Sequence, residues 1–182
     1  MLIDIAVVAL VALAVVWDIR IHKIPNWLTF TAVAAGVGLN MWQAGFSGLV
    51  VSLQGLLVGL AVFLIPFVLG GMGGGDVKLI GAIGALKGWV FVLHVALFTA
   101  LWGGVIALLA VVITKQFKVL HDFGIGLGLF VWTSGKIGVE SMLPHEKSVS
   151  ENQRLVVPYG IAIFAGTISA YFVNFVNVKI PG

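Results

Sequence analysis

The sequence contains no cysteine in its 182 residues. This absence excludes disulfide bonds, thiol catalysis and cysteine-ligated zinc, and the redox compartment cannot be read from it. Charged residues are also scarce, at 9% of the chain, whereas an average soluble domain has about 25%. Apolar residues make up 60%, and the mean hydropathy is +1.15. This composition predicts an integral membrane protein.

The positive charge does not indicate a nucleic-acid-binding protein. The net charge is only +3, and the basic residues are scattered along the chain, where they flank apolar segments and set membrane topology. We therefore expect a lipid bilayer, and no nucleic acid, as partner. The N-terminus lacks the basic region and cleavage site of a signal peptide, so its apolar segment is expected to remain as a membrane helix.

The apolar segments predict an all-α, polytopic membrane fold in a single domain, 1–182. A spanning helix needs about 20 mainly apolar residues, and the chain has room for about six. Within the third, Gly55 and Gly59 form a small-xxx-small pattern that allows close helix packing. The fourth and fifth are alternatively one interrupted segment. The expected helices are Leu2–Trp17 with an extension toward Asp18, Trp27–Trp42, Leu49–Leu69, Asp76–Leu86, Trp89–Ile113 and Val156–Val178.

The distribution of basic residues predicts the orientation in the membrane. With six spans, the loops 18–26, 70–78 and 114–155 lie on one side and hold eight of the ten Lys and Arg residues. The positive-inside rule places that side in the cytoplasm. The middle of the last loop, 123–133, is apolar but too short to span, so we expect an interfacial or re-entrant piece there.

Two aspartates stand at the ends of very apolar segments. Asp18 precedes a charged turn, 19–26, and Asp76 follows a glycine run, 70–75. The chain has only seven acidic residues, and an ionisable group at membrane depth is costly and a functional candidate by default. Because two expected spans separate the aspartates, both should emerge at the same, cytoplasmic, face.

Two neighbouring carboxyl groups favour aspartic-protease chemistry. They share one proton, so the ionised member can activate water while the protonated member donates to a peptide carbonyl. Glycines before Asp76 would let water and substrate backbone approach, and they can adopt positive φ. Pro25 ends the first segment and turns the chain into the second helix.

Each of these features also has a simpler interpretation. Asp18 could be an interface residue paired with Arg20 or Lys23, and Asp76 could cap a helix N-terminus. The glycine run could be a linker, and Lys78 an interface anchor. No histidine pair has metal-ligand spacing, so we expect no metal and no cofactor.

Three motifs together resemble the prepilin peptidase family, the membrane aspartic proteases of type IV pilus systems. An aspartate precedes an Ile-Pro-Asn turn, here Asp18 and Ile24-Pro25-Asn26. A Gly-x-Gly-Asp motif follows as Gly73-Gly74-Gly75-Asp76, continued by Val77-Lys78-Leu79. Pro158-Tyr159-Gly160 leads into the last helix. The similarity extends over most of the chain.

The resemblance implies that Asp18 and Asp76 are the catalytic pair. The further residues expected to support the site or bind substrate are Arg20, Pro25, Asn26, Gly73, Gly74, Gly75 and Lys78. It implies cleavage of the basic leader from pilin-like precursors, before their apolar N-terminal helix, at the cytoplasmic face of the plasma membrane. Larger members carry a cysteine-containing insert and an N-methylating activity. This chain has neither the insert nor any cysteine, and it is similar to the short, peptidase-only form of tight-adherence pilus systems, with archaeal preflagellin peptidases as relatives.

Two other functions stay open at this point. Presenilin-like intramembrane proteases share Gly-x-Gly-Asp, but their first aspartate lies within a membrane helix in a different motif. A small proton- or cation-coupled transporter could also use Asp18 and Asp76, because intramembrane acids mark such pathways. The transporter would show ion-dependent function and no proteolysis.

Overall fold

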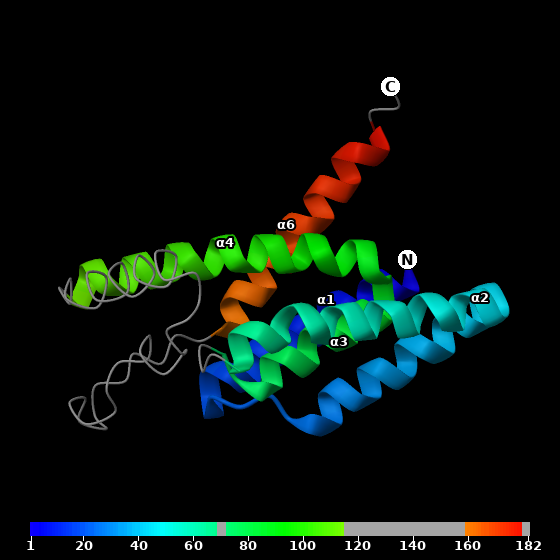
Figure 1. Ribbon diagram of the computed structural model, residues 1–182, viewed down its shortest axis with the longest axis horizontal. Coiled ribbons are helices and arrows are strands. Elements are labelled where there is room, and N and C mark those ends of the chain that lie inside the picture. Colours follow the sequence, from blue (N-terminus) through cyan, green and yellow to red (C-terminus); the bar gives the residue numbers. More distant parts are fainter. Residues whose placement is uncertain (69–71, 115–158, 180–182) are drawn as a thin grey trace, which may run out of the picture. The chain divides into compact units, whose positions relative to one another are not determined.

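The computed structural model describes residues 1–68, 72–114 and 159–179. This part of the chain is helical, with no strand, and confirms the all-α prediction. The expected interfacial piece at 123–133 and the residue Pro158 lie outside the described residues. The helices are α1 (Leu2–Ile21), α2 (Asn26–Val68), α3 (Gly74–Lys87), α4 (Trp89–Thr114) and α6 (Tyr159–Lys179), shown in Figure 1.

The chain divides into two units, Met1–Gly103 with Pro158–Gly182, and Gly104–Val157. The first unit contains α1, α2, α3, α6 and the N-terminal part of α4, and it holds everything discussed below. Of the second unit, only the last turns of α4 belong to the described residues. The single domain expected from the sequence stays a prediction.

Helix α2 is a hairpin of two arms. Gly45 has non-helical backbone angles, φ 57° and ψ −137°, and the chain doubles back there (Figure 1). The arms 26–44 and 46–68 correspond to the second and third expected helices. They are joined by Asn40, whose Nδ2 donates to Ser52 Oγ at 2.9 Å, and by Ser52, whose Oγ donates to Gly36 O at 3.2 Å.

Helix α3 is the centre of the first unit. From Leu79 to Leu86 every residue is buried, as expected of a helix that is apolar all round. Both arms of α2 approach its backbone closely: a Cβ at Gly36 would lie 2.8 Å from Ala85 O, and one at Gly59 would lie 2.8 Å from Ile80 O. Gly55 likewise faces Gly84, so the small-xxx-small prediction is confirmed. Helices α1 and α6 also contact α3.

Gly88 separates α3 from α4. Its positive φ of 84° is a conformation that glycine adopts readily, and it ends α3 after Lys87. The prediction of two helices with a short turn between them is therefore right, and the alternative of one segment is wrong.

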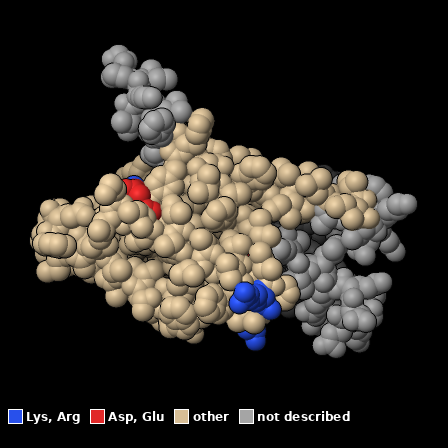
Figure 2. Space-filling model, turned by 180° about the vertical axis from the view of Figure 1, so that it is seen from behind, with Lys and Arg blue, Asp and Glu red and all other residues tan. Residues whose placement is uncertain are grey.

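Three helices are long and apolar enough to cross a membrane: α1, α2 and the Trp89–Leu109 part of α4. Each arm of α2 has about the length that spans a bilayer. Helix α3 has 14 residues, or about 21 Å at 1.5 Å per residue, which is shorter than the hydrocarbon core of about 30 Å. The number of six spans therefore stays a prediction. Figure 2 shows a face with charged side chains in only small spots, as suits a membrane protein.

Candidate active site

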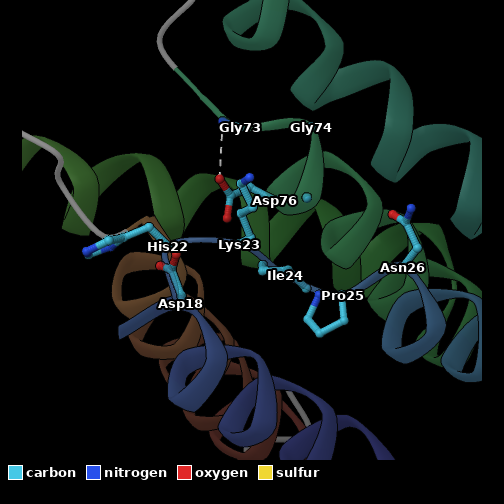
Figure 3. Close-up of a pocket in the computed structure, with 10 residues that line it drawn as sticks. Asp18, His22, Lys23, Ile24, Pro25, Asn26, Gly73, Gly74 and Asp76 are labelled. Carbon is cyan, nitrogen blue, oxygen red and sulfur yellow. Dashed lines mark hydrogen bonds between the residues drawn. The ribbon is translucent and has the colours of Figure 1, made fainter. Parts of the chain in front are cut away.

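A pocket of about 430 Å³ lies where α1 ends and α3 begins. Two segments far apart in the sequence form it: the end of α1 with the turn into α2, and the first turn of α3 with the glycines before it (Figure 3). The lining residues are Asp18, His22, Lys23, Ile24, Pro25, Asn26, Gly73, Gly74, Gly75 and Asp76.

Asp18 reaches the pocket from the last turn of α1. It continues the buried face of this helix, which also includes Val7, Val11 and Ala14. Asp18 itself is only 8% exposed. A carboxylate in such a place needs hydrogen-bond donors. The backbone N–H of Gly160, at the start of α6, donates to Asp18 Oδ2 at 2.9 Å.

The turn after α1 holds its shape through local contacts. His22 has left-handed backbone angles, φ 50° and ψ 33°, and its N–H donates to Asp18 O at 2.9 Å. Trp17 and Trp27 pack edge to face across the turn with ring centroids 5.8 Å apart. Ile24, which lies between the two tryptophans in the sequence, is buried. Helix α2 then begins at Asn26.

Asp76 enters the pocket from the first turn of α3. Helix α3 begins at Gly74 with Gly73 as its N-cap, so Asp76 is the third helical residue and not the N-cap itself. Its Oδ2 accepts the Gly73 N–H at 3.2 Å. Asp76 is also only 8% exposed. It therefore contributes to capping, and its carboxyl group still lines the pocket.

Asp76 lies in the short helix α3, outside the three helices that are long enough to cross a membrane. Burial first, and then the negative charge of Asp18, raise its pKa to about 6, while the Gly73 N–H opposes the shift. Burial disfavours the charged carboxylate, and so does a like charge nearby. Figure 3 shows the two carboxyl groups directed toward the same part of the pocket. The arrangement therefore favours one proton on the pair.

The glycines before Asp76 are needed for space. Gly73, Gly74 and Gly75 do not use the positive φ that glycine can adopt: within the described chain the positive-φ glycines are Gly45 and Gly88, and Gly73 has an ordinary φ of −78°. A Cβ at Gly75, in contrast, would lie 3.2 Å from the Cβ of Ile24, across the pocket wall. Close approach of the two segments explains the glycine.

The structure places most, but not all, of the predicted site residues around the pocket. Asp18, Pro25, Asn26, the three glycines and Asp76 line it. Arg20 is exposed on the last turn of α1 and does not line the pocket. Lys78 is exposed and also outside the lining, but its Nζ donates to Asn26 Oδ1 at 2.9 Å. It thereby ties α3 to the start of α2.

The simpler interpretation of Asp18 as a partner of basic residues is not supported. Among the described residues the ion pairs join Asp4 to Lys87 and to the amino group of Met1, and neither Arg20 nor Lys23 pairs with Asp18. In this part of the chain no three His, Asp or Glu side chains lie together as a metal site would require. The expected absence of a metal and a cofactor stays a prediction.

Sequence reasoning did not assign four residues to the site. His22, Lys23 and Ile24 line the pocket, and their position between Asp18 and Pro25 was the available signal. Gly160 contacts Asp18 from α6. It belongs to the Pro-Tyr-Gly motif, but spacing alone could not bring together residues that are 142 positions apart.

Comparison with known proteins identifies the family of the chain. The profile of the type IV leader peptidase family matches residues 5–108, more than half of the chain and both aspartates. Two curated relatives are prepilin leader peptidase/N-methyltransferases from Burkholderia pseudomallei strains 1026b and K96243, each 31% identical over 109 residues. The match covers 56% of this chain and 35% of each relative. No solved structure matches the chain.

The match confirms the resemblance drawn from the sequence motifs. It includes α1, α2 and α3, which are the helices that build the pocket. The chain belongs to the type IV leader peptidase family.

Proposed function

We propose that the protein is an aspartic endopeptidase that cleaves the N-terminal leader of prepilin-like precursors. The observation that carries this proposal is the meeting of Asp18 and Asp76 in one pocket, in a chain that belongs to this family. They come from different helices, are both almost fully buried, and have backbone donors that leave carboxylate oxygen atoms available.

The two carboxyl groups divide the work of peptide hydrolysis between them. Asp76, with its raised pKa, carries the shared proton, and Asp18 acts as the base. Asp18 takes a proton from water, the water oxygen bonds to the scissile carbonyl carbon, and Asp76 gives its proton to the carbonyl oxygen. The C–N bond then breaks as the new amine receives a proton from Asp18, and the carboxylate pair regains one proton from the diol intermediate.

The substrates we propose have a basic leader followed by an apolar N-terminal helix. Such a helix can lie in the bilayer against the exposed apolar residues of the enzyme while its leader junction enters the pocket. The bias of basic residues in the sequence supports a multi-pass protein of the plasma membrane with this pocket on the cytoplasmic side.

The experiment is co-expression of the protein with pilin-like precursors encoded beside it, with precursor size read on a gel. Asp18→Asn and Asp76→Asn should each abolish cleavage while the protein still accumulates in the membrane. The matched control is Asp4→Asn, because Asp4 lies in α1 as well but its partners are Lys87, Tyr171 and the amino group of Met1, away from the pocket lining. This variant should retain cleavage.

The result separates the proposal from its alternatives. Near-normal cleavage by either pocket variant would contradict a role for the pair. A transporter predicts no cleavage by the wild type and an ion dependence that both pocket variants lose. A presenilin-like protease would cut an apolar segment within its length and leave the leader junction intact.

A further inference from the structure

We propose that Gly160, in the first turn of α6, is a positioning residue for the Asp18 carboxylate and that its lack of a side chain is required for cleavage. This inference rests on the proposed function, because it assigns a role to Gly160 through Asp18. It makes the start of α6 a part of the active site, although no residue of α6 is among those lining the pocket.

The contact between Gly160 and Asp18 is direct and buried. The Gly160 N–H donates to Asp18 Oδ2 at 2.9 Å, and Gly160 itself is buried. Backbone N–H groups in the first turn of a helix have no partner within that helix. They therefore bind an anion well, and the positive end of the helix dipole adds to the attraction. The carboxylate receives a strong, directional bond from α6.

This bond selects an orientation for Asp18. Among the hydrogen bonds of the described chain, the one that reaches its carboxylate holds Oδ2. With Oδ2 directed at α6, Oδ1 is the oxygen that remains to contact water or substrate. Figure 3 shows the carboxyl group of Asp18 on the side of the pocket where Asp76 lies. Rotation of the Asp18 side chain would break the bond to Gly160 and turn the free oxygen away.

Any side chain at residue 160 would interfere with this contact. A Cβ there would lie 2.7 Å from Asp18 Oδ2, 3.1 Å from its Cβ and 3.2 Å from its Cγ. Real Cβ atoms essentially never approach another heavy atom to less than 3.0 Å, so the carboxylate or α6 must move. The backbone angles of Gly160 do not require glycine, because it is not among the positive-φ residues. The reason for glycine is therefore the space that Asp18 occupies.

The test compares Gly160→Ala with Gly166→Ala in purified, detergent-solubilised enzyme acting on a precursor peptide. Both are glycine-to-alanine changes in α6 at buried positions. At Gly166 the new Cβ would meet Thr99 of α4, whose backbone N would be 2.7 Å away, and not Asp18. Gly166→Ala therefore disturbs the packing of α6 at a position where the new methyl group does not contact Asp18. Asp18→Asn is measured in the same assay.

We expect Gly160→Ala to lower kcat by about 100-fold, the order of effect that follows from misplacing a reacting group by about 1 Å. KM should change by less than about threefold, because a positioning group acts in the transition state and not in substrate binding. Gly166→Ala should keep kcat, per folded molecule, within about threefold of the wild type. The kcat of each variant is taken per folded molecule, because a loss of folded enzyme would also lower the apparent kcat without changing KM. The difference between Gly160→Ala and Gly166→Ala then isolates the effect at the carboxylate.

Two results would overturn the inference while the proposed function stands: Asp18→Asn is inactive but Gly160→Ala cleaves normally, or both alanine variants lose kcat equally. Cleavage by Asp18→Asn would overturn the proposed function together with the inference. If Gly160→Ala fails to accumulate, the double variant with Asp18→Ala decides. Asp18→Ala removes the carboxylate with which the new methyl group at residue 160 would clash, so the double variant should accumulate again. If it does not accumulate, the inference is overturned.

Discussion

The three glycines before Asp76 provide a graded test of the site, because a methyl group at each would meet a different neighbour. At Gly74 the new Cβ would lie 3.4 Å from the ring of Phe67, an ordinary van der Waals contact. At Gly75 it would lie 3.2 Å from the Cβ of Ile24. At Gly73 it would lie 3.1 Å from Asp76 Oδ2. We expect Gly74→Ala to be mild and the other two to impair cleavage.

The size of the effect at Gly75 follows from that contact. Carbon atoms pack best at about 3.5–4.0 Å, so Ile24, which lies in the pocket wall, must move by a few tenths of an ångström. Overpacking of this kind costs about 1–3 kcal/mol. At about 1.4 kcal/mol for each factor of ten in rate, Gly75→Ala should lower cleavage by roughly 5- to 150-fold if the strain falls on the transition state. Gly75→Val, with two further methyl groups, should be worse.

The assay is cleavage of a co-expressed precursor, normalised to the amount of enzyme in the membrane. Gly74→Ala is the matched control, since both residues lie in the first turn of α3 and gain the same helix propensity from alanine. It should stay within about threefold of the wild type, because an ordinary contact costs little. Equal, near-normal cleavage in Gly74→Ala and Gly75→Ala would refute the reasoning and return the glycine run to the role of a linker.

Four further predictions concern pH, metal, topology and stability. Cleavage should fall by about tenfold between pH 6 and 7.5, because Asp76, with a pKa near 6, loses the shared proton as the pH rises; a rate that is constant over this interval would contradict that role. Cleavage should survive EDTA, whereas loss that zinc restores would indicate a metalloprotease. In intact cells an impermeant thiol reagent should label Trp42→Cys, which is 84% exposed in the wild type, and not Met72→Cys beside the pocket; the reverse pattern would overturn the proposed orientation. Asn40→Leu should lower stability in detergent by about 1–2 kcal/mol, since its amide also donates to Ala85 O and Leu86 O of α3 and such bonds are worth about 0.6 kcal/mol each on average in membrane proteins; an unchanged unfolding midpoint would show that these bonds contribute nothing.

Much of the helical fold could be predicted because membrane helices are long apolar runs with local boundaries. The observed α1 runs to Ile21, beyond the expected extension toward Asp18. The helix includes the polar residues Asp18 and Arg20 and ends only where His22 adopts left-handed angles. The two arms of α2 were expected as separate helices, and the non-helical backbone angles of Gly45 separate them.

The pairing of the aspartates could be predicted from topology, but the construction of the pocket could not. An even number of helices between Asp18 and Asp76 returns the chain to the same end of the bundle. Which side chains then meet depends on packing between distant segments. The contact of Gly75 with Ile24 and the bond from Gly160 to Asp18 are of this kind. For the glycines, composition suggested flexible backbone, whereas the structure shows ordinary φ and crowded surroundings.

The position of Asp18 follows from the same periodicity that packs α1. Val7, Val11, Ala14 and Asp18 recur at intervals of four and three residues and form one buried face, as 3.6 residues per turn requires. The last member of that face is the only charged one, and it lies one turn before the helix ends. At the other end of α1, Asp4 binds Lys87 at the C-terminus of α3. The packing of α1 against α3 therefore accounts for the position of Asp18, which shares one pocket with Asp76 of α3. In the described chain this position does not depend on an ion pair between a basic residue and Asp18.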